Sequence, residues 1–177
     1  MVNLFINYYV DKNPNRKKEL HTCFAKNEGN HAIDQICIII DNHLIYFQPY
    51  KKIVTRIIME RPTFKDFFEF INEVSGPDDI NIIANTDIYF DEAGIELIKN
   101  NIKLNECYAL SRWDIAADGS HKLFDRPDTA DTWIFVGKIK DIPDCDFCLG
   151  IPGCDNSIAY KLKKEYWAHT GNRIAVR

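Results

Sequence analysis

Apolar runs separated by polar, turn-forming segments divide the chain into alternating strands and helices. Leu4–Val10 and Ile36–Ile40 are continuous runs rich in aromatic and β-branched residues, with the length of buried strands. Between them, the segment from Arg16 to about Lys26 carries its apolar residues at helical spacing. A strand, a helix and a second strand in this order are typical of a parallel βαβ unit.

The same alternation continues along the chain. We predict further strands at Leu44–Phe47, Ile53–Met59, Ile80–Ile83, Tyr108–Leu110 and Trp133–Val136. We predict further helices from Pro62-Thr63-Phe64 to Gly76, over Glu92–Asn100 and over Asn156–Trp167, with a polar loop at Ala116–Ala130. The right-handed crossover rule places helices on both faces. The prediction is an α/β, Rossmann-like fold: a mainly parallel sheet flanked by helices, in a single domain over residues 1–177.

Composition and charge narrow the class of protein. The chain has 177 residues, is 46% hydrophobic and contains no apolar run near the roughly 20 residues that cross a bilayer. The start, Met1–Ile6, is interpreted as a strand and not as a signal peptide, which favours a cytoplasmic protein. The formal net charge of −4 argues against a general nucleic-acid-binding surface, which requires clustered Lys and Arg.

The cysteines are interpreted as free thiols of a reducing compartment. Cys145-x-x-Cys148 followed by Cys154 has metal-like spacing, but a structural zinc site needs a fourth ligand. Only distant histidines such as His121 or His169 offer one. Free thiols are therefore preferred to a zinc site.

Polar residues follow two of the predicted buried strands directly. They are Asp41-Asn42 and Asn85-Thr86-Asp87. Ligands of open α/β sheets bind beyond the carboxyl ends of the strands, so both groups should reach one crevice. Mg²⁺ and Mn²⁺ commonly bind through one or two carboxylates plus substrate phosphates, which makes Asp87 a candidate metal ligand. The alternative for Asp87 is a turn residue or helix cap.

Two later segments also carry candidate chemistry. In Leu149–Asn156, a Gly- and Pro-containing loop leads into a helix, so Asp155 is either part of an N-cap or a general base presented from a rigid loop. Arg112-Trp113-Asp114 and Asp131-Thr132-Trp133 place tryptophans beside carboxylates, a common way to hold a sugar. Trp133 alone is better explained as core. Asp131, beside an apolar strand, needs a partner if it is buried.

Taken together, these segments resemble a small GT-A-type glycosyltransferase, of the group that includes glycosyltransferase domains of large DNA viruses and related bacterial proteins. The resemblance spans most of the chain. Its markers, in order, are Asn7-Tyr8-Tyr9 with Arg16 and Glu19, Arg61–Phe64, Ala84–Asp91, Ala109–Asp114, Asp131–Phe135 and Leu149–Asn156.

The resemblance implies a nucleotide-sugar donor and a divalent metal, Mn²⁺ or Mg²⁺. Asn85-Thr86-Asp87 matches the family's Asp-x-Asp motif with Asn at the first position, which leaves Asp87 as the main metal ligand. Asn7, Asp41, Arg61 and Asn85 are then expected to contact the nucleotide. A uridine diphosphate sugar is favoured as donor, followed by a guanosine diphosphate sugar.

The resemblance also implies a glycan acceptor and inversion at the sugar. Asp155 is expected to be the general base, with Asp131 as the competing base or an acceptor ligand. Further contacts to the acceptor are expected from Arg112, Trp113, Asp114 and Trp133. Many such enzymes add a late metal-binding histidine. Either His169 takes that role, or the chain is one domain of a longer protein, or the metal site is incomplete.

Two alternatives stay open. A metal-dependent nucleotidyltransferase also uses strand-end carboxylates and Mg²⁺, although the chain has no Walker loop and no Gly-x-Gly-x-x-Gly fingerprint. A non-catalytic nucleotide-sugar-binding module is suggested by Asn85 and by the short C-terminal region. The released by-product, a nucleoside diphosphate or pyrophosphate, separates sugar transfer from nucleotide transfer.

Overall fold

The fold was obtained as a computed structural model, which describes residues 1–41, 52–116, 118–126 and 129–170. Its strands are β1 Val2–Tyr8, β2 Gln35–Ile40, β3 Ile53–Ile57, β4 Ile80–Ala84, β5 Glu106–Leu110, β6 Trp113–Ile115, β7 His121–Leu123, β8 Thr132–Val136 and β9 Trp167–Thr170. Its helices are α1 Pro14–Gly29, α2 Phe64–Val74, α3 Glu92–Asn101 and α4 Cys154–Glu165.

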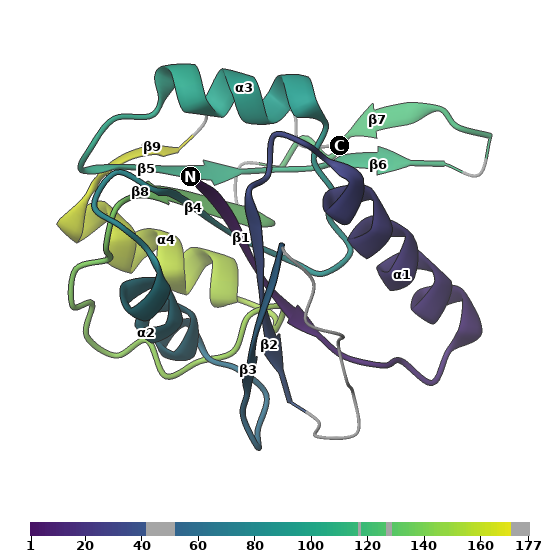
Figure 1. The fold of residues 1–177 in the computed structure, drawn as a ribbon, viewed down its shortest axis with the longest axis horizontal. Helices are drawn as coiled ribbons and strands as arrows, with labels where there is room; N and C mark the ends of the chain where they lie inside the picture. The colour runs from purple at the N-terminus through teal and green to yellow at the C-terminus, as the bar shows by residue number, and fades with distance from the viewer. Residues whose placement is uncertain (42–51, 117, 127–128, 171–177) are drawn as a thin grey trace.

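One large sheet organises the described part of the chain. Its seven strands are ordered β3-β2-β1-β4-β8-β5-β9, and β8 pairs antiparallel with both of its neighbours. The other pairings in this sheet are parallel. Because β8 runs the opposite way, the residues just before it meet the carboxyl ends of β4 and β5 at one edge. Strands β6 and β7 form a separate hairpin (Figure 1).

Helices cover both faces of the sheet, as Figure 1 shows. On one face, aromatic residues of α2 and apolar residues of α4 pack on side chains such as Phe5 and Phe135. On the other, Phe24 of α1 and Ile95 and Ile98 of α3 pack on a second set of strand residues. The continuous apolar runs of β1 and β2 are explained by this arrangement, because both faces of these strands are buried.

Local sequence fixes where the helices begin. Thr63 closes a capping box with Asp66 at the start of α2, so two of the first N–H groups of the helix have partners. Asn13 caps α1 and Pro14 occupies its first turn, where the missing proline N–H is not needed. Because α1 begins only a few residues after the end of β1, its N-terminal end lies at the carboxyl edge of the sheet.

The predicted fold class is confirmed: the sheet is mostly parallel and is flanked by helices. The segment Ala116–Ala130, predicted as a loop, instead contains β7, because its polar residues pair with the exposed strand β6. The last helix begins at Cys154, two residues before the predicted Asn156, and Trp167 belongs to β9. The predicted strand Leu44–Phe47 lies outside the described residues.

Gly137, which follows β8, provides a test of this packing. Its φ is +75°, and a Cβ there would lie 2.5 Å from the backbone oxygen of Pro77. Gly119, in the β6–β7 turn, has φ +82° but no atom within 4 Å of such a Cβ. Gly119→Ala should lower the free energy of unfolding by about 1–2 kcal/mol from the left-handed backbone alone. Gly137→Ala should exceed this by about 1–3 kcal/mol, because a backbone atom is displaced.

Chemical denaturation of the two variants beside the wild type gives these differences directly. Equal losses for both variants would show that the backbone of Pro77 moves away at no additional cost in stability.

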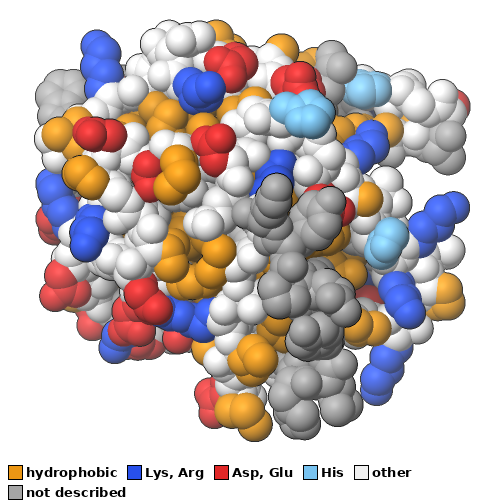
Figure 2. All heavy atoms as spheres, in the orientation of Figure 1, with side chains coloured by type: hydrophobic (Ala, Val, Ile, Leu, Met, Phe, Trp, Pro, Cys, Tyr) orange, Lys and Arg blue, Asp and Glu red, His pale blue; other side chains and the backbone are white. Residues whose placement is uncertain are grey.

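Charges of both signs are interspersed over the described part of the face drawn in Figure 2. Within the described residues, no helix combines the length and apolar character of a membrane-spanning segment.

Candidate functional site

A polar pocket lies where the predicted crevice should be, at the carboxyl edge of β1 and β4. Its volume is about 480 Å³. The N-terminal end of α1, the turn after β4, the residues around β8 and the loop before α4 all contribute to it. Its lining residues are Asn7, Tyr9, Arg16, Glu19, Arg61, Asn85, Thr86, Asp87, Arg112, Asp114, Asp131, Leu149 and Gly150.

The turn after β4 is anchored to the sheet on two sides. The backbone N–H of Asn85 donates to the carbonyl of Asp131 at 3.1 Å, and the Thr86 hydroxyl donates to the carbonyl of Asn7. The N–H of Ile88 returns to the carbonyl of Asn85 at 3.1 Å and closes the turn. Asp87 is therefore held in place by its backbone, while its side chain stays 27% exposed in the pocket.

Arg16 reaches the same carboxylate from the first turns of α1. Its Nη1 lies 2.9 Å from Asp87 Oδ2 and 2.7 Å from Glu19 Oε2. Burial alone would lower the pKa of Arg16, but these two carboxylates raise it above its usual value. The guanidinium is thus a permanent cation that offsets the charge of Asp87.

A second cluster lies on the β8 side of the pocket. Nη1 of Arg112 donates to both oxygens of the buried Asp131, at 3.1 and 3.0 Å, and Nε donates to Asp114 at 2.7 Å. Nδ2 of Asn85 donates to Asp131 Oδ1 at 3.0 Å. The Arg112 guanidinium also stacks on the Phe124 ring, 4.1 Å from its centroid. This arrangement supplies the partner that a buried Asp131 requires.

Burial raises the pKa of Asp131 above its usual value, although Arg112 and Asn85 oppose the rise. Removing the opposing cation should therefore raise it further. In Arg112→Gln, we expect the pKa of Asp131 to rise above its value in the wild type, because an opposite charge in contact with a carboxyl group lowers its pKa and the variant loses that charge. A carbon-13 NMR titration of the Asp131 carboxyl measures this. An unchanged pKa would show that Asn85 alone stabilises the carboxylate.

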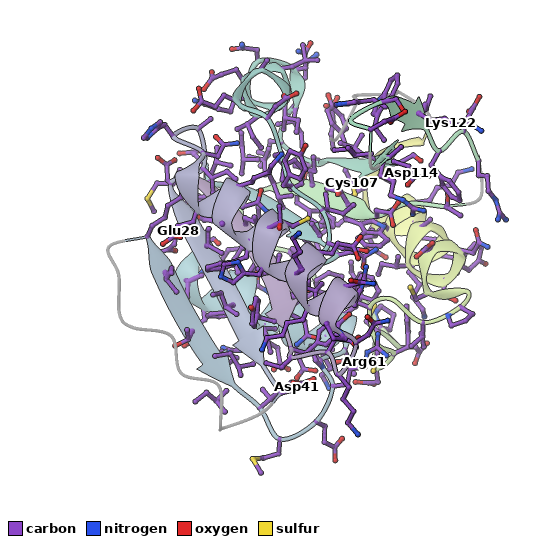
Figure 3. All side chains as sticks on the ribbon, turned by 90° about the vertical axis from the view of Figure 1, so that its right-hand side faces the viewer. Glu28, Asp41, Arg61, Cys107, Asp114 and Lys122 are labelled. Carbon is purple, nitrogen blue, oxygen red and sulfur yellow. The ribbon has the colours of Figure 1, made fainter. Side chains whose placement is uncertain are left out.

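Arg61 comes from the segment before α2 and faces the loop before α4. Its Nη2 donates to the carbonyl of Leu149 at 2.7 Å, and the backbone of Thr63 forms a β-bridge with Cys148. Gly150 has φ +72°, and a Cβ there would lie 3.2 Å from Arg61 Nη2. Glycine at this position lets the loop approach the guanidinium closely. In Figure 3, Glu28 marks the C-terminal end of α1, and Arg61 lies near the other, N-terminal end of this helix.

Arg61 differs from the other two arginines of the pocket. Arg16 and Arg112 each have two carboxylate partners, whereas no carboxylate in the described part of the chain forms an ion pair with Arg61. Its charge is therefore available to an anionic ligand.

Seven of the predicted site residues line this pocket. They are Asn7, Arg61, Asn85, Asp87, Arg112, Asp114 and Asp131, the last predicted as the competing base. Of the two predicted strand ends, the one after β4 places Asn85, Thr86 and Asp87 at the pocket, whereas Asp41, after β2, does not line it.

Four other predicted site residues do not line the pocket. Trp133 is fully buried and packs edge-on against Phe64, so it belongs to the core and does not face an acceptor. Trp113 lies in β6, and Asp41 follows β2 at the edge of the described residues. Asp155 lies in the first turn of α4, which Gly153 caps, and accepts a hydrogen bond from the Cys154 thiol at 3.0 Å. Nucleotide contact by Asp41 and base catalysis by Asp155 stay predictions.

The cysteines with metal-like spacing have separate partners. Cys148 Sγ donates to the carbonyl of Arg61, and Cys145 Sγ to that of Pro143. Burial and the neighbouring Asp155 raise the pKa of Cys154 to about 11, so this thiol is protonated at neutral pH. Among the described residues, no group of three or more His, Cys, Asp or Glu could hold a metal. The side chain of His169 lies outside the described residues.

The pocket fits a divalent cation that is held mainly by the phosphates of a bound substrate and only partly by the protein. Asp87 is a hard oxygen donor on a fixed turn, and Asn85 beside it adds an amide. Mg²⁺ typically keeps several waters and binds through one or two carboxylates plus substrate phosphates. One carboxylate in a pocket with room for substrate phosphates matches this mode, whereas a site built only from protein ligands would need more donors.

Arg16 and Glu19 are pocket residues that the sequence did not indicate as candidate site residues. They appeared only as markers of the family resemblance. One signal was present: a cation in the first turn of a helix is disfavoured by the helix dipole, and the first turn of α1 contains no acid. An arginine in such a place suggests a role outside the helix.

Of the comparisons with known proteins, the one with solved structures gave matches. No family model matches the sequence, and no curated protein is similar to it. A solved nucleotidyl transferase from Methanothermobacter thermautotroptrophicus is similar over 99% of this chain and 87% of its own, with a TM-score of 0.55 and 9% identity. A 4-diphosphocytidyl-2C-methyl-D-erythritol synthase from Anaerococcus prevotii covers 76% of this chain and 69% of its own, with a TM-score of 0.46 and 13% identity. At 9% identity, the likeness to the nucleotidyl transferase shows the fold alone.

Proposed function

We propose that the protein is a metal-dependent nucleotidyltransferase, which binds a nucleoside triphosphate in the pocket at the carboxyl edge of β1 and β4. The observation that carries the proposal is the joint presence of Asp87 on a fixed turn and three arginines in one strand-end pocket. The fold is shared with a solved nucleotidyl transferase, which supports this reaction over the sugar transfer implied by the family resemblance.

The charges of the pocket argue for a metal. Three arginines and four carboxylates line it, so its formal net charge is −1. A triphosphate that entered such a site without a counter-ion would meet repulsion from carboxylates in a partly desolvated space. A divalent cation on Asp87 would supply charge neutralisation and Lewis-acid activation of the phosphates.

Residues on two sides of the pocket then have different roles, phosphate binding on one side and proton transfer on the other. Arg61, whose charge no described carboxylate offsets, is placed to bind phosphate oxygens. On the other side, Arg112 and Asn85 orient Asp131. The raised pKa of Asp131 suits a group that accepts a proton from an acceptor hydroxyl. Asp131 is thus preferred to Asp155 as the base, because only Asp131 lines the pocket.

The reaction balances as follows. The acceptor oxygen forms a bond to the α-phosphorus while the bond from that phosphorus to the bridging oxygen breaks. The acceptor proton passes to Asp131, and pyrophosphate leaves with the electron pair of the broken bond.

Glycosyl transfer is the second candidate, and a specific observation favours it. The segment between β1 and α1, residues 9–13, contains no glycine, so it offers no Gly-rich backbone cradle for a triphosphate. A nucleoside diphosphate sugar, with Asp87 beside its diphosphate, would need less of such a cradle. In that case the bond broken is the one between the sugar and the diphosphate.

The products distinguish the two reactions. The protein is incubated with Mg²⁺ or Mn²⁺ and either the four ribonucleoside triphosphates or uridine and guanosine diphosphate sugars, together with sugar phosphates and free sugars as acceptors. Pyrophosphate release that requires both the metal and an acceptor supports the proposal. Release of a nucleoside diphosphate from a sugar donor would replace it with glycosyl transfer. Binding of nucleotides without either product would indicate the non-catalytic module.

A further inference from the structure

Arg16 is the least expected cation of the pocket, because it stands at the positive end of a helix. The first turn of α1 contributes no acidic residue that would hold it there. Its Nη1 instead lies 2.9 Å from Asp87 Oδ2, on the turn after β4, and 2.7 Å from Glu19 Oε2. One of these two carboxylates, Asp87, is the group assigned to the metal.

We propose that Arg16 is the counter-ion of Asp87 in the donor-free protein, and that it makes metal binding depend on the phosphate donor. The identity of the donor as a nucleoside phosphate rests on the proposed function. The effect of Arg16 on a metal ion alone does not.

Charge and distance explain the first half of this role. A divalent cation on Asp87 would come close to the guanidinium, because Arg16 Nη1 already contacts Oδ2 of that carboxylate. The two cations repel each other, and both side chains are only about one-third or less exposed, so water screens the repulsion incompletely. The metal must either displace Arg16 from Asp87 or bind beside it. In either case the affinity of the protein for the metal is lowered.

A phosphate ligand removes this conflict. Arginine pairs strongly with phosphate oxygens through two parallel hydrogen bonds, so a donor in the pocket offers Arg16 a new partner. Arg16 can then leave Asp87 to the metal, while Glu19, three residues further along α1, keeps the side chain near the pocket. The donor and the metal should therefore bind cooperatively, and each should strengthen the other by the same factor.

The test measures Mn²⁺ binding by electron paramagnetic resonance without any nucleotide. Arg16→Gln should bind Mn²⁺ about 5-fold or more tightly than the wild type, the lower end of typical coupling between sites. Lys17→Gln is the matched control: it removes the same charge from the neighbouring residue, which is exposed and does not line the pocket. Its Mn²⁺ affinity should stay at the wild-type value, and Arg16→Lys, which keeps a cation, should stay near it.

Two further measurements test whether the gain in Mn²⁺ affinity depends on Asp87 and on the phosphate donor. In the double variant Arg16→Gln with Asp87→Asn, the gain in Mn²⁺ affinity should disappear. With uridine triphosphate present, the wild type should bind Mn²⁺ more tightly than without it, and this enhancement should shrink in Arg16→Gln. Thermal unfolding checks that each variant is folded, and Arg16→Met serves as a second uncharged variant.

Equal Mn²⁺ affinity of wild type and Arg16→Gln would overturn the proposal. An equal gain in Lys17→Gln, or a gain that survives the loss of Asp87, would do the same, because the effect would then be general or located elsewhere. Failure of the proposed function shows separately, as absence of product, since the Mn²⁺ measurement needs neither donor nor turnover.

Discussion

Asp87→Asn should lower metal-dependent transfer by about 10²–10³-fold, the loss typical of removing one group that stabilises charge in the transition state. Asp87 is the one carboxylate on the fixed turn after β4, and without it the metal would be held only by the Asn85 amide, water and phosphates. Asparagine has the same shape and still offers Arg16 an oxygen, so the pocket should keep its geometry. Initial rates over a range of Mg²⁺ concentrations measure both the turnover and the metal requirement.

The transfer activity that Asp87→Asn loses should be partly recovered at high metal concentration. The melting temperature of the variant should differ little from that of the wild type. Asp118→Asn is the control, since this exposed carboxylate lies in the β6–β7 turn and does not line the pocket. Its activity should equal that of the wild type. If Asp87→Asn kept full activity at low Mg²⁺, Asp87 would not be a metal ligand.

Asp131→Asn should lower turnover by about 10²–10⁴-fold, the usual contribution of a general base. The amide cannot accept the acceptor proton, although it still fits between Arg112 and Asn85. Because burial raises the pKa of Asp131, the rate of the wild type should fall as pH drops through that raised value. The variant should lose this limb of the pH profile. Rates from pH 4 to pH 9 with a saturating donor measure both effects.

Asp155→Asn makes the comparison with the base expected from the family resemblance. If Asp131 is the base, turnover in Asp155→Asn should stay within a few-fold of the wild type. The reverse pattern, a large loss in Asp155→Asn and a small one in Asp131→Asn, would move the base to the first turn of α4. It would also require that loop to close over the pocket when the acceptor binds.

Asp131 also makes the stability of the folded protein depend on pH, and this dependence has the opposite direction to that of most carboxylates. A raised pKa in the folded state means that the folded protein holds this proton more tightly than the unfolded chain does. The contribution of Asp131 to stability is therefore fully present below its unfolded pKa. It is lost as the pH rises through the folded pKa.

The sequence predicted those parts of the site that depend on a single strand and the turn after it. Asp87 was found because it follows a buried run directly, and the parallel sheet carries it to the edge where ligands bind. Asp131 was recognised as a carboxylate that needs a partner, because apolar residues follow it. Neither inference required knowledge of how distant strands pair.

The parts that were missed depend on pairing over long distances along the chain. Arg112 meets Asp131 because β8 is inserted antiparallel between β4 and β5, an order that periodicity does not reveal. Arg16 meets Asp87 across 71 residues for a similar reason: β1 and β4 are neighbours in the sheet. Asp155 was given a role from its place before a helix, but the sequence does not indicate which way a first turn faces.

That residues 1–177 form one catalytic domain stays a prediction.

The insertion of β8 has a consequence for how the chain reaches this fold. Until β8 has been synthesised, the side of β4 that it covers has unpaired backbone groups, next to the apolar residues of Ile80–Ala84. An exposed apolar strand edge is a template for pairing with other chains. A nascent or truncated chain that ends before Thr132 should therefore aggregate or recruit a chaperone. Asp131 directly precedes β8, so the pairing that covers this edge of β4 also brings the buried carboxylate to the pocket.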